Sequence, residues 1–290
     1  RKAQNFRLQK LKPALILANK FDKFILPTPE GYGIGARHNY YFSHMLNCIY
    51  DCRYCFLQGM YRSANYVLFT NYLDFRQAME SKINELHGEE VHFFSGYDCD
   101  SLAFEPVTGF AEYFLPLFRQ NPTAKLELRT KSTQTRSLLN IEPIPNCIIA
   151  LSFTPTEIAQ ALEHKAPSIE RRIETMQNLQ SHGWNIGLRF DPLIYQDNYR
   201  EIYDNLFDQV FKQLKNTELH SVSLGSFRLP KNFFHTLSRL YPDEKLFASP
   251  LEESNGMISY KNSLRKALHQ HCSKRILEHV PEDKFFFYEN

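Results

Sequence analysis

Three of the six cysteines, Cys48, Cys52 and Cys55, lie within eight residues in the segment NCIYDCRYCFLQG (47 to 59). They are too close together to form useful disulfides with one another. Thiolates hold iron-sulfur clusters, and three of them leave one iron of a four-iron cluster open for chemistry, as catalytic zinc sites also keep a position open. The alternatives are a zinc ion with His44 as a fourth ligand, or clustering by chance.

The composition is that of an ordinary globular protein. The chain has 290 residues, 43% of them hydrophobic and 23% charged, enough for one large domain or two small ones. A net charge of +2 does not by itself indicate nucleic acid. No apolar run approaches the roughly 18 to 20 residues that cross a bilayer, and ALILA (14 to 18) is too short for a signal peptide core. We therefore expect a cytoplasmic monomer without a membrane partner.

The elements that position the cysteines alternate between strand and helix. Predicted strands are rich in β-formers, and the helices between them follow helical periodicity. The strands are 40 to 46, 90 to 96, 125 to 131, 146 to 153, 185 to 192 and 220 to 226; the helices are 73 to 86, 109 to 120, 168 to 183 and 199 to 215. This order favours a parallel barrel or part of one, with a doubly wound open sheet as the competing architecture. In a barrel enzyme the chemistry lies at the carboxyl ends of the strands.

The spacing Cys-x3-Cys-x2-Cys, with Tyr54 before the last cysteine, resembles the signature of the radical S-adenosylmethionine superfamily. Within it, the chain is most similar to the spore photoproduct lyase family. The matching segments are CIYDCRYCFLQG, DSLAFEPVTG (100 to 109), LRTKS (128 to 132), SIERRIETMQNLQSHGWNIG (168 to 187) and PEDKFFFYEN (281 to 290). The resemblance implies an α/β fold: a partial (β/α)6 TIM-like barrel over 40 to 226, an N-terminal extension (1 to 39) and a C-terminal extension with hairpin and helix (227 to 290) packed on the barrel.

The same resemblance implies the chemistry. Cys48, Cys52 and Cys55 would hold a [4Fe-4S] cluster whose free iron binds S-adenosyl-L-methionine, and reduction by a donor such as flavodoxin or ferredoxin would give a 5'-deoxyadenosyl radical. The radical would repair a thymine-dimer lesion in DNA. By position, the cofactor would be lined by Tyr54, Ser95, Gly96, Lys131, Ser152 and Asp191. The structural alternatives are a solvated Lys131, a turn serine at 152 and a loop cap at Asp191.

The resemblance breaks where hydrogen returns to the product. The family uses a cysteine assisted by tyrosines; Tyr97 stands at that cysteine's position and Phe56 at one tyrosine position. Cys99 could substitute as the catalytic donor with Tyr97, although two residues along a strand move a thiol by about 6.5 Å. A purely structural Cys99 is the alternative.

The substrate end departs too. The hairpin region SPLEESNGMISY (249 to 260), where the family has a basic residue, carries Glu252 and Glu253. Phosphate could instead contact Arg62, Arg228 or Lys231, and bases could stack on Tyr61, Tyr66 or Tyr72. Surface solvation and core packing are the alternatives for these two groups. GYGIGAR (31 to 37) lacks the preceding strand of a phosphate loop and is interpreted as a flexible linking segment.

Three hypotheses follow: a lyase similar to spore photoproduct lyase, a radical enzyme acting on another nucleic acid or nucleotide, and a zinc-bearing nucleic-acid-binding protein without catalysis.

Overall fold

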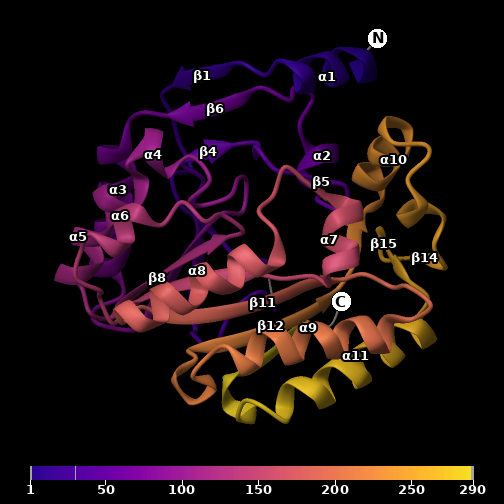
Figure 1. Cartoon of the computed structure of the whole chain (residues 1–290). Coiled ribbons are helices and arrows are strands. Elements are labelled where there is room, and N and C mark those ends of the chain that lie inside the picture. The colour runs from indigo at the N-terminus through magenta and orange to yellow at the C-terminus, as the bar shows by residue number, and fades with distance from the viewer. Residues whose placement is uncertain (1, 30, 289–290) are drawn as a thin grey trace.

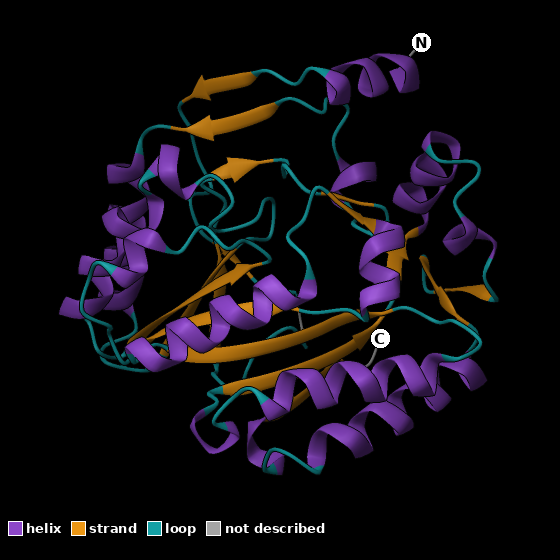
Figure 2. Ribbon diagram, in the orientation of Figure 1, coloured by secondary structure: helices purple, strands orange, loops and turns teal. Residues whose placement is uncertain are grey.

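The centre of the molecule is one curled eight-stranded sheet (Figures 1 and 2). The computed structural model describes residues 2 to 29 and 31 to 288. From edge to edge the strands are β16 (Phe285–Tyr288), β12 (Ser221–Ser226), β11 (Asn185–Leu193), β9 (Cys147–Ser152), β8 (Ala124–Thr130), β7 (Val91–Ser95), β3 (His38–Tyr41) and β2 (Leu26–Pro27). Only β2 runs antiparallel to its neighbour among these described strands.

The strand order identifies a partial barrel. From β3 to β16, each strand along the chain adds on the same side of the one before. A doubly wound sheet would instead reverse direction at a switch point. The predicted partial barrel is therefore confirmed, and the open sheet is wrong.

The sequence located most of the sheet but erred at its two margins. The predicted strand 40 to 46 is in fact two strands, because β3 pairs with β7 whereas β4 (Met45–Leu46) pairs with β6 (Tyr66–Phe69) in another sheet. The strand β16 was not predicted; it lies in the segment assigned to an extension and pairs with β12.

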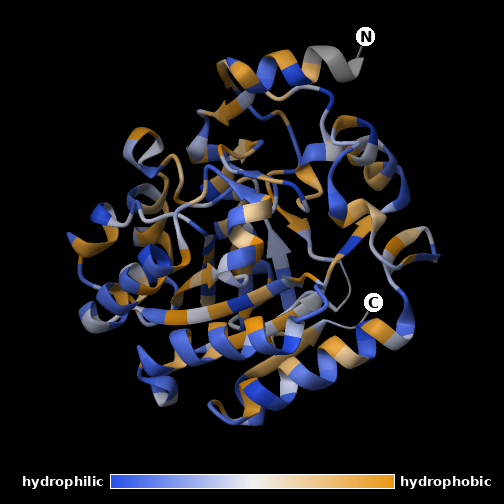
Figure 3. Cartoon of the chain, turned by 45° about the vertical axis from the view of Figure 1, so that its right-hand side comes forward, coloured by the Kyte–Doolittle hydropathy of each residue, from blue (hydrophilic) through white to orange (hydrophobic). Residues whose placement is uncertain are grey.

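Helices cover the outer face of the sheet. The larger ones are α3 (Tyr72–Glu85), α5 (Phe110–Gln120), α8 (Ile169–His182), α9 (Tyr199–Lys212) and α11 (Asn262–Leu277). Their hydrophobic and hydrophilic residues alternate along the ribbon, as expected for helices with one buried side (Figure 3). Helix α8 begins and ends as predicted: the Ser168 hydroxyl accepts a hydrogen bond from the Arg171 backbone N–H (3.4 Å), and Gly183 ends it at φ +107°.

The two faces of the sheet differ because side chains alternate along each strand. On β8, Leu126 and Leu128 belong to the apolar core with the helices, whereas Glu127 faces the concave side. There its carboxylate accepts hydrogen bonds from Arg189 of β11 (2.7 and 3.2 Å), across the intervening strand β9. The interior of the half-barrel is therefore polar and charged.

Smaller elements surround the sheet. One small sheet joins β1 (Leu15–Ala18), β6 and β4; another joins β5 (Asp51–Cys52) and β10 (Glu163–His164); a third joins β13 (Arg228–Pro230), β15 (Met257–Tyr260) and β14 (Leu251–Ser254). The remaining helices are α1 (Lys2–Leu11), α2 (Leu57–Met60), α4 (Glu105–Thr108), α6 (Arg136–Leu139), α7 (Thr156–Leu162) and α10 (Lys231–Leu240), with 3-10 turns η1 (Asn216–Glu218), η2 (Lys245–Ala248) and η3 (Glu282–Lys284). Within the described residues, no helix combines the length and apolarity that a membrane crossing needs.

The segment interpreted as a flexible linker packs against the far edge of the sheet. Tyr32 stacks on Tyr288 of β16 with 5.5 Å between ring centroids. At Gly35 (φ +90°) an added Cβ would lie 3.4 Å from the ring of Phe286. Residues from both ends of the described chain thus meet beside the interior.

Candidate functional site

The cysteine loop is fastened to the barrel by backbone pairing. Cys52 lies on β5, which pairs antiparallel with β10 so that Cys52 faces Glu163. The next backbone N–H, of Arg53, donates to the carbonyl of Leu162 (2.8 Å). Cys48, Cys52 and Cys55 are all free. The loop is thereby held beside the loops that follow β8 and β9.

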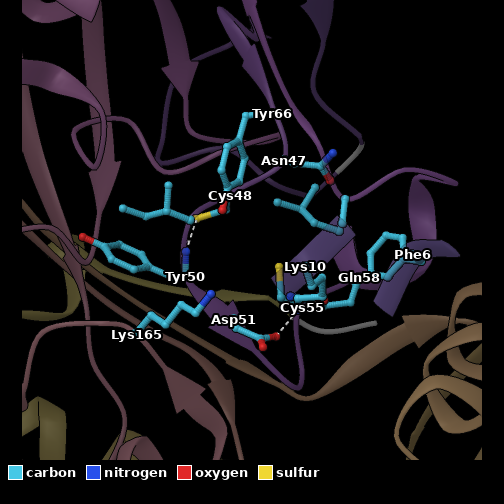
Figure 4. Close-up of a pocket in the computed structure, with 13 residues that line it drawn as sticks. Phe6, Lys10, Asn47, Cys48, Tyr50, Asp51, Cys55, Gln58, Tyr66 and Lys165 are labelled. Carbon is cyan, nitrogen blue, oxygen red and sulfur yellow. Dashed lines mark hydrogen bonds and ion pairs between the residues drawn. The ribbon is translucent and has the colours of Figure 1, made fainter. Parts of the chain in front are cut away.

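Two of the three cysteines face one small cavity of about 30 Å³ (Figure 4). Cys48 and Cys55 line it together with Lys10, Asp51 and nine other residues, some polar and some apolar. The Tyr50 backbone N–H donates to Cys48 Sγ at 3.4 Å. Burial raises the pKa of all three thiols, to about 12 for Cys52. They would become thiolates only with a cationic group bound beside them.

The donor set fits a cluster better than a single ion. Among the described residues, no three His, Cys, Asp or Glu side chains converge as a set that could hold one metal ion. In a cluster each thiolate binds a different iron, so the three sulfur atoms surround one cluster but can lie farther apart than around a single ion. His44, the fourth ligand of the zinc alternative, stacks on Phe110 in the core (3.8 Å) and faces Cys99 instead. The zinc arrangement with His44 is therefore not present.

A buried polar network lies beneath Tyr54. The Tyr54 hydroxyl donates to Glu163, which also accepts from Thr154 (3.0 Å) and pairs with Arg172 of α8. Both charged side chains are 0% exposed. Burial raises the pKa of Glu163, but the charges of Lys131 and Arg172 outweigh that effect and hold it below its usual value. The loop is thus tied to the barrel by a charged network.

Lys131 brings a positive charge from the end of β8 to the cysteine loop. Its ammonium lies 5.5 Å from the centre of the Tyr54 ring. Burial lowers the pKa of Lys131, but the charges of Glu163 and Cys52 have the larger effect together, so this pKa lies above its ordinary value. The Lys131 ammonium has no hydrogen-bond or ion-pair partner among the described residues, although the Lys131 backbone N–H donates to Asp100. The cysteine loop therefore has a buried positive charge beside it.

Ser95 and Gly96 build the turn after β7. The Ser95 hydroxyl is 2.6 Å from the Ser101 hydroxyl and donates to the Glu127 carbonyl (3.2 Å). Gly96 has φ +86°, and a Cβ there would lie 2.8 Å from the Arg129 carbonyl. The turn is held by Asp100, whose carboxylate accepts from Thr130 (2.6 Å) and the Lys131 backbone (2.7 Å). Gly96 can therefore meet a ligand only through its backbone.

Ser152 and Asp191, the other two residues expected to line the cofactor, accept hydrogen bonds from side chains of this chain. The Ser152 carbonyl, at the end of β9, accepts from Arg172 (3.1 Å). Asp191 on β11 accepts two hydrogen bonds from Arg228 (3.1 and 3.2 Å). Arg228 also donates to the Tyr32 hydroxyl (2.8 Å). Arg228 is thus part of the interior rather than an exposed phosphate contact.

The two hydrogen-donor candidates lie in different surroundings. Tyr97 is half-buried and stacks on Tyr41 with 4.5 Å between centroids. Burial is the main cause that raises the pKa of Tyr97, and the charge of Arg129 opposes this effect. Cys99 is 4% exposed, and its thiol is 3.9 Å from His44 Nδ1. The sequence placed these two residues close together, but the fold gives them different neighbours.

The acidic hairpin is explained by its own contacts. Glu252 accepts from the backbone N–H of Asn262 at the start of α11 (2.8 Å), and Glu253 pairs with Lys231 (2.8 Å). Lys231 is therefore partnered, whereas Arg62 is exposed.

The aromatic stacking candidates are mostly engaged. Tyr72 packs among Phe110, Tyr113 and Phe114, and Tyr66 packs edge-on against Phe104 (5.2 Å). Burial is the main cause that raises the pKa of Tyr61, and the charge of Asp98 adds to it. Phe56 is half-buried just before α2. Tyr72 and Tyr66 are therefore packed against other rings, although Tyr66 also lines the cavity beside Cys48.

Three residues that organise the site were missed by the sequence analysis: Asp100, Glu163 and Arg172. Asp100 and Arg172 lie inside segments quoted for the family resemblance, but each stands near other charged residues in the sequence, so charge alone did not mark them. Glu163 follows a short helix and has no sequence signal that we can identify.

Comparison with known proteins agrees with this geometry. A family model described as spore photoproduct lyase matches residues 37 to 288. The chain is 22% identical to spore photoproduct lyase of Clostridium acetobutylicum over 72% of this chain and 62% of that protein. It is 21% identical to that of Bacillus subtilis, over 69% and 59%. The chain therefore spans about 60% of the length of these relatives.

Solved structures show the same fold. A spore photoproduct lyase variant with bound AdoMet and dinucleoside spore photoproduct superposes with a TM-score of 0.83, at 16% identity, over 95% of this chain and 82% of that one.

Proposed function

Since the chain belongs to the spore photoproduct lyase family, we propose that it is a radical S-adenosylmethionine enzyme that repairs a thymine-dimer lesion, the spore photoproduct, in DNA. The observation that carries the proposal is the placement of the three-cysteine loop against the carboxyl ends of the parallel strands, with Lys131 beside it. This is the edge where barrel enzymes do their chemistry.

The residues of the loop would hold the cofactors. Cys48, Cys52 and Cys55 would bind a [4Fe-4S] cluster, and the Lys131 ammonium would offset the charge of the thiolates or of the carboxylate of S-adenosylmethionine. Bound there and reduced, the cluster and S-adenosylmethionine supply a 5'-deoxyadenosyl radical. Tyr54 anchors the loop through Glu163, and Gly96 keeps the turn narrow enough for its backbone to approach a ligand.

The interior would receive the lesion. The stacked pairs Tyr41/Tyr97 and Tyr32/Tyr288 offer flat aromatic surfaces, and Arg129 lies near Tyr97 and Tyr288. A splayed pyrimidine pair needs stacking partners of this kind once it leaves the duplex. Ser152 on β9 and Asp191 on β11 would line the cofactor.

Hydrogen return is assigned to Tyr97 rather than Cys99. Tyr97 is half-buried and stacks on Tyr41 just after β7 ends, whereas the Cys99 thiol is turned towards His44 in the core. The altered donor also supports a second candidate, a radical enzyme whose target is another nucleic acid or nucleotide.

The decisive experiment is an anaerobic incubation of reconstituted protein with S-adenosylmethionine, dithionite and a synthetic spore-photoproduct dinucleotide. Mass spectrometry would follow 5'-deoxyadenosine and repaired thymidine dinucleotide. Both products support the lyase, whereas 5'-deoxyadenosine without repair supports the second candidate. Iron content without either product would count against the lyase without testing the second candidate, and zinc in place of iron would reject the cluster.

Variants then test the donor. Tyr97→Phe should abolish repair while 5'-deoxyadenosine still forms, and Cys99→Ala should retain repair. The opposite pattern would assign the donor to Cys99.

An external one-electron donor such as flavodoxin or ferredoxin would reduce the cluster. The proposed location is the cytoplasm, because such donors and an oxygen-sensitive cluster are suited to it. A monomer is the proposed state, since nothing in the site calls for a residue from a second copy.

A further inference from the structure

One lysine joins the two ends of the cysteine loop. Lys10, on α1, donates to Asp51, to the Gln58 side-chain oxygen (2.7 Å) and to the Tyr241 hydroxyl (2.9 Å). Asp51 immediately precedes Cys52, and Gln58 follows Cys55 by three residues. A lysine ammonium has three N–H donors, so all three are used. None remains for a ligand, which points to positioning rather than direct binding.

The contacts around Lys10 reinforce one another. The Tyr241 hydroxyl also donates to Gln58 (3.0 Å). Arg53, between the second and third cysteines, donates to Asp51 (3.1 Å) and lies 3.9 Å from the centre of the Tyr241 ring. The loop is therefore held from outside by α1 and by the residue that ends α10.

Helix α1 is fixed over the cavity by further contacts. Arg7 donates to the carbonyls of Arg239 (3.0 Å) and Leu240 at the end of α10. Phe6 packs in a small apolar cluster with Ala64 and Leu240. Phe6 and Lys10 line the same cavity as Cys48 and Cys55, and Figure 4 shows Lys10 beside Gln58, Asp51 and Cys55.

We infer that Lys10 is a positioning residue for the cysteine loop and that α1 is a cover closing the outer side of its cavity. The family model begins at residue 37, so this arrangement comes from a segment that the family match does not include. The inference rests on the proposed function, because it gives the positioned loop a cluster to hold and to shield. The hydrogen bond from the Lys10 ammonium to the Asp51 carboxylate joins two charged groups, and such bonds are stronger than those between neutral groups.

The first test is made on protein without cofactor. Lys10→Met keeps the alkyl chain and removes the ammonium; Lys12→Met is the matched control, since Lys12 is exposed on the same stretch. Amide hydrogen exchange of the peptide covering 51 to 58 should quicken by about tenfold in Lys10→Met and stay unchanged in Lys12→Met. Tyr241→Phe, which removes one acceptor, should give an intermediate increase and replaces Lys10→Met if that variant does not fold.

The second test is made after anaerobic reconstitution. Iron should leave Lys10→Met faster than wild type on addition of a chelator, with Lys12→Met like wild type. Exchange equal to wild type in Lys10→Met, or an equal change in both lysine variants, would overturn the inference. If wild-type protein takes up no iron, the proposed cluster fails, while the exchange comparison still decides the role of Lys10.

Discussion

The Glu163–Arg172 pair gives the sharpest stability prediction, through the variant Arg172→Met. Both side chains are 0% exposed, and the guanidinium also donates to the carbonyls of Pro167 (2.9 Å) and Ser152 (3.1 Å). Methionine would leave Glu163 as a buried charge without its ion-pair partner. Breaking a buried pair from one side costs about 3 to 5 kcal/mol. That is a large part of the roughly 5 to 15 kcal/mol that stabilises a native domain.

Urea unfolding of cofactor-free protein measures this loss. The single tryptophan, Trp184, is 3% exposed just after α8, the helix that carries Arg172, and reports unfolding by fluorescence. The control is Arg171→Met, because Arg171 is the exposed neighbour on the same helix and should change the free energy of unfolding by about 0.5 kcal/mol or less.

A double variant separates the ion pair from general damage to the helix. Adding Glu163→Gln to Arg172→Met removes the unpaired charge and keeps an oxygen for Tyr54 and Thr154. The double variant should lose less stability than Arg172→Met alone. A loss under about 1 kcal/mol in Arg172→Met, or strict additivity of the two changes, would refute the reasoning.

Three further predictions concern single features. Burial is the main cause that lowers the pKa of His92 to about 4, below its ordinary 6.5, so the unfolded chain binds more protons between these values and stability is lost as the pH falls. His92 should account for about 2 kcal/mol of lost unfolding free energy at pH 5 in urea titrations, and an equally steep decline in His92→Gln would contradict this. Gly96→Ala should destabilise the protein by about 1 to 3 kcal/mol more than Gly88→Ala. Both glycines have positive φ, but only at Gly96 would the added Cβ lie 2.8 Å from a carbonyl oxygen. Equal urea midpoints for the two variants would show that the backbone moves to relieve this contact. Changing any one loop cysteine to alanine should abolish iron uptake measured after reconstitution, whereas Cys147→Ala, in the core, should retain it; full iron content in a loop variant would remove that cysteine from the ligand set.

The main elements of the barrel were predictable because local signals agree with the fold. Short runs of β-formers mark β7, β8, β9, β11 and β12, and Ser168 and Gly183 mark the ends of α8. The run YYFSHML failed because it is continuous in sequence while its two halves pair with different partners. Periodicity describes one segment at a time and does not specify its neighbours.

The cysteine loop was predictable from spacing, but its supports were not. Glu163 reaches Tyr54 and Arg172 only after the chain has folded back on itself. Asp191, which was expected to line the cofactor, pairs with Arg228 of β13, a contact that its own segment does not indicate. Such long-range pairs leave no trace in local composition, whereas caps and periodicity do.

The stacking of Tyr32 on Tyr288 and the pairing of β12 with β16 bear on how the chain is made on the ribosome. Because synthesis runs from the N-terminus, β12 can pair with β11 as soon as it emerges, but its other edge has no partner until β16 (Phe285–Tyr288) has been added. Unpaired strand edges on a growing chain invite pairing with other chains. Contacts between residues so far apart in sequence also form slowly. We therefore expect nascent chains stopped after β12 to be the aggregation-prone species of this protein.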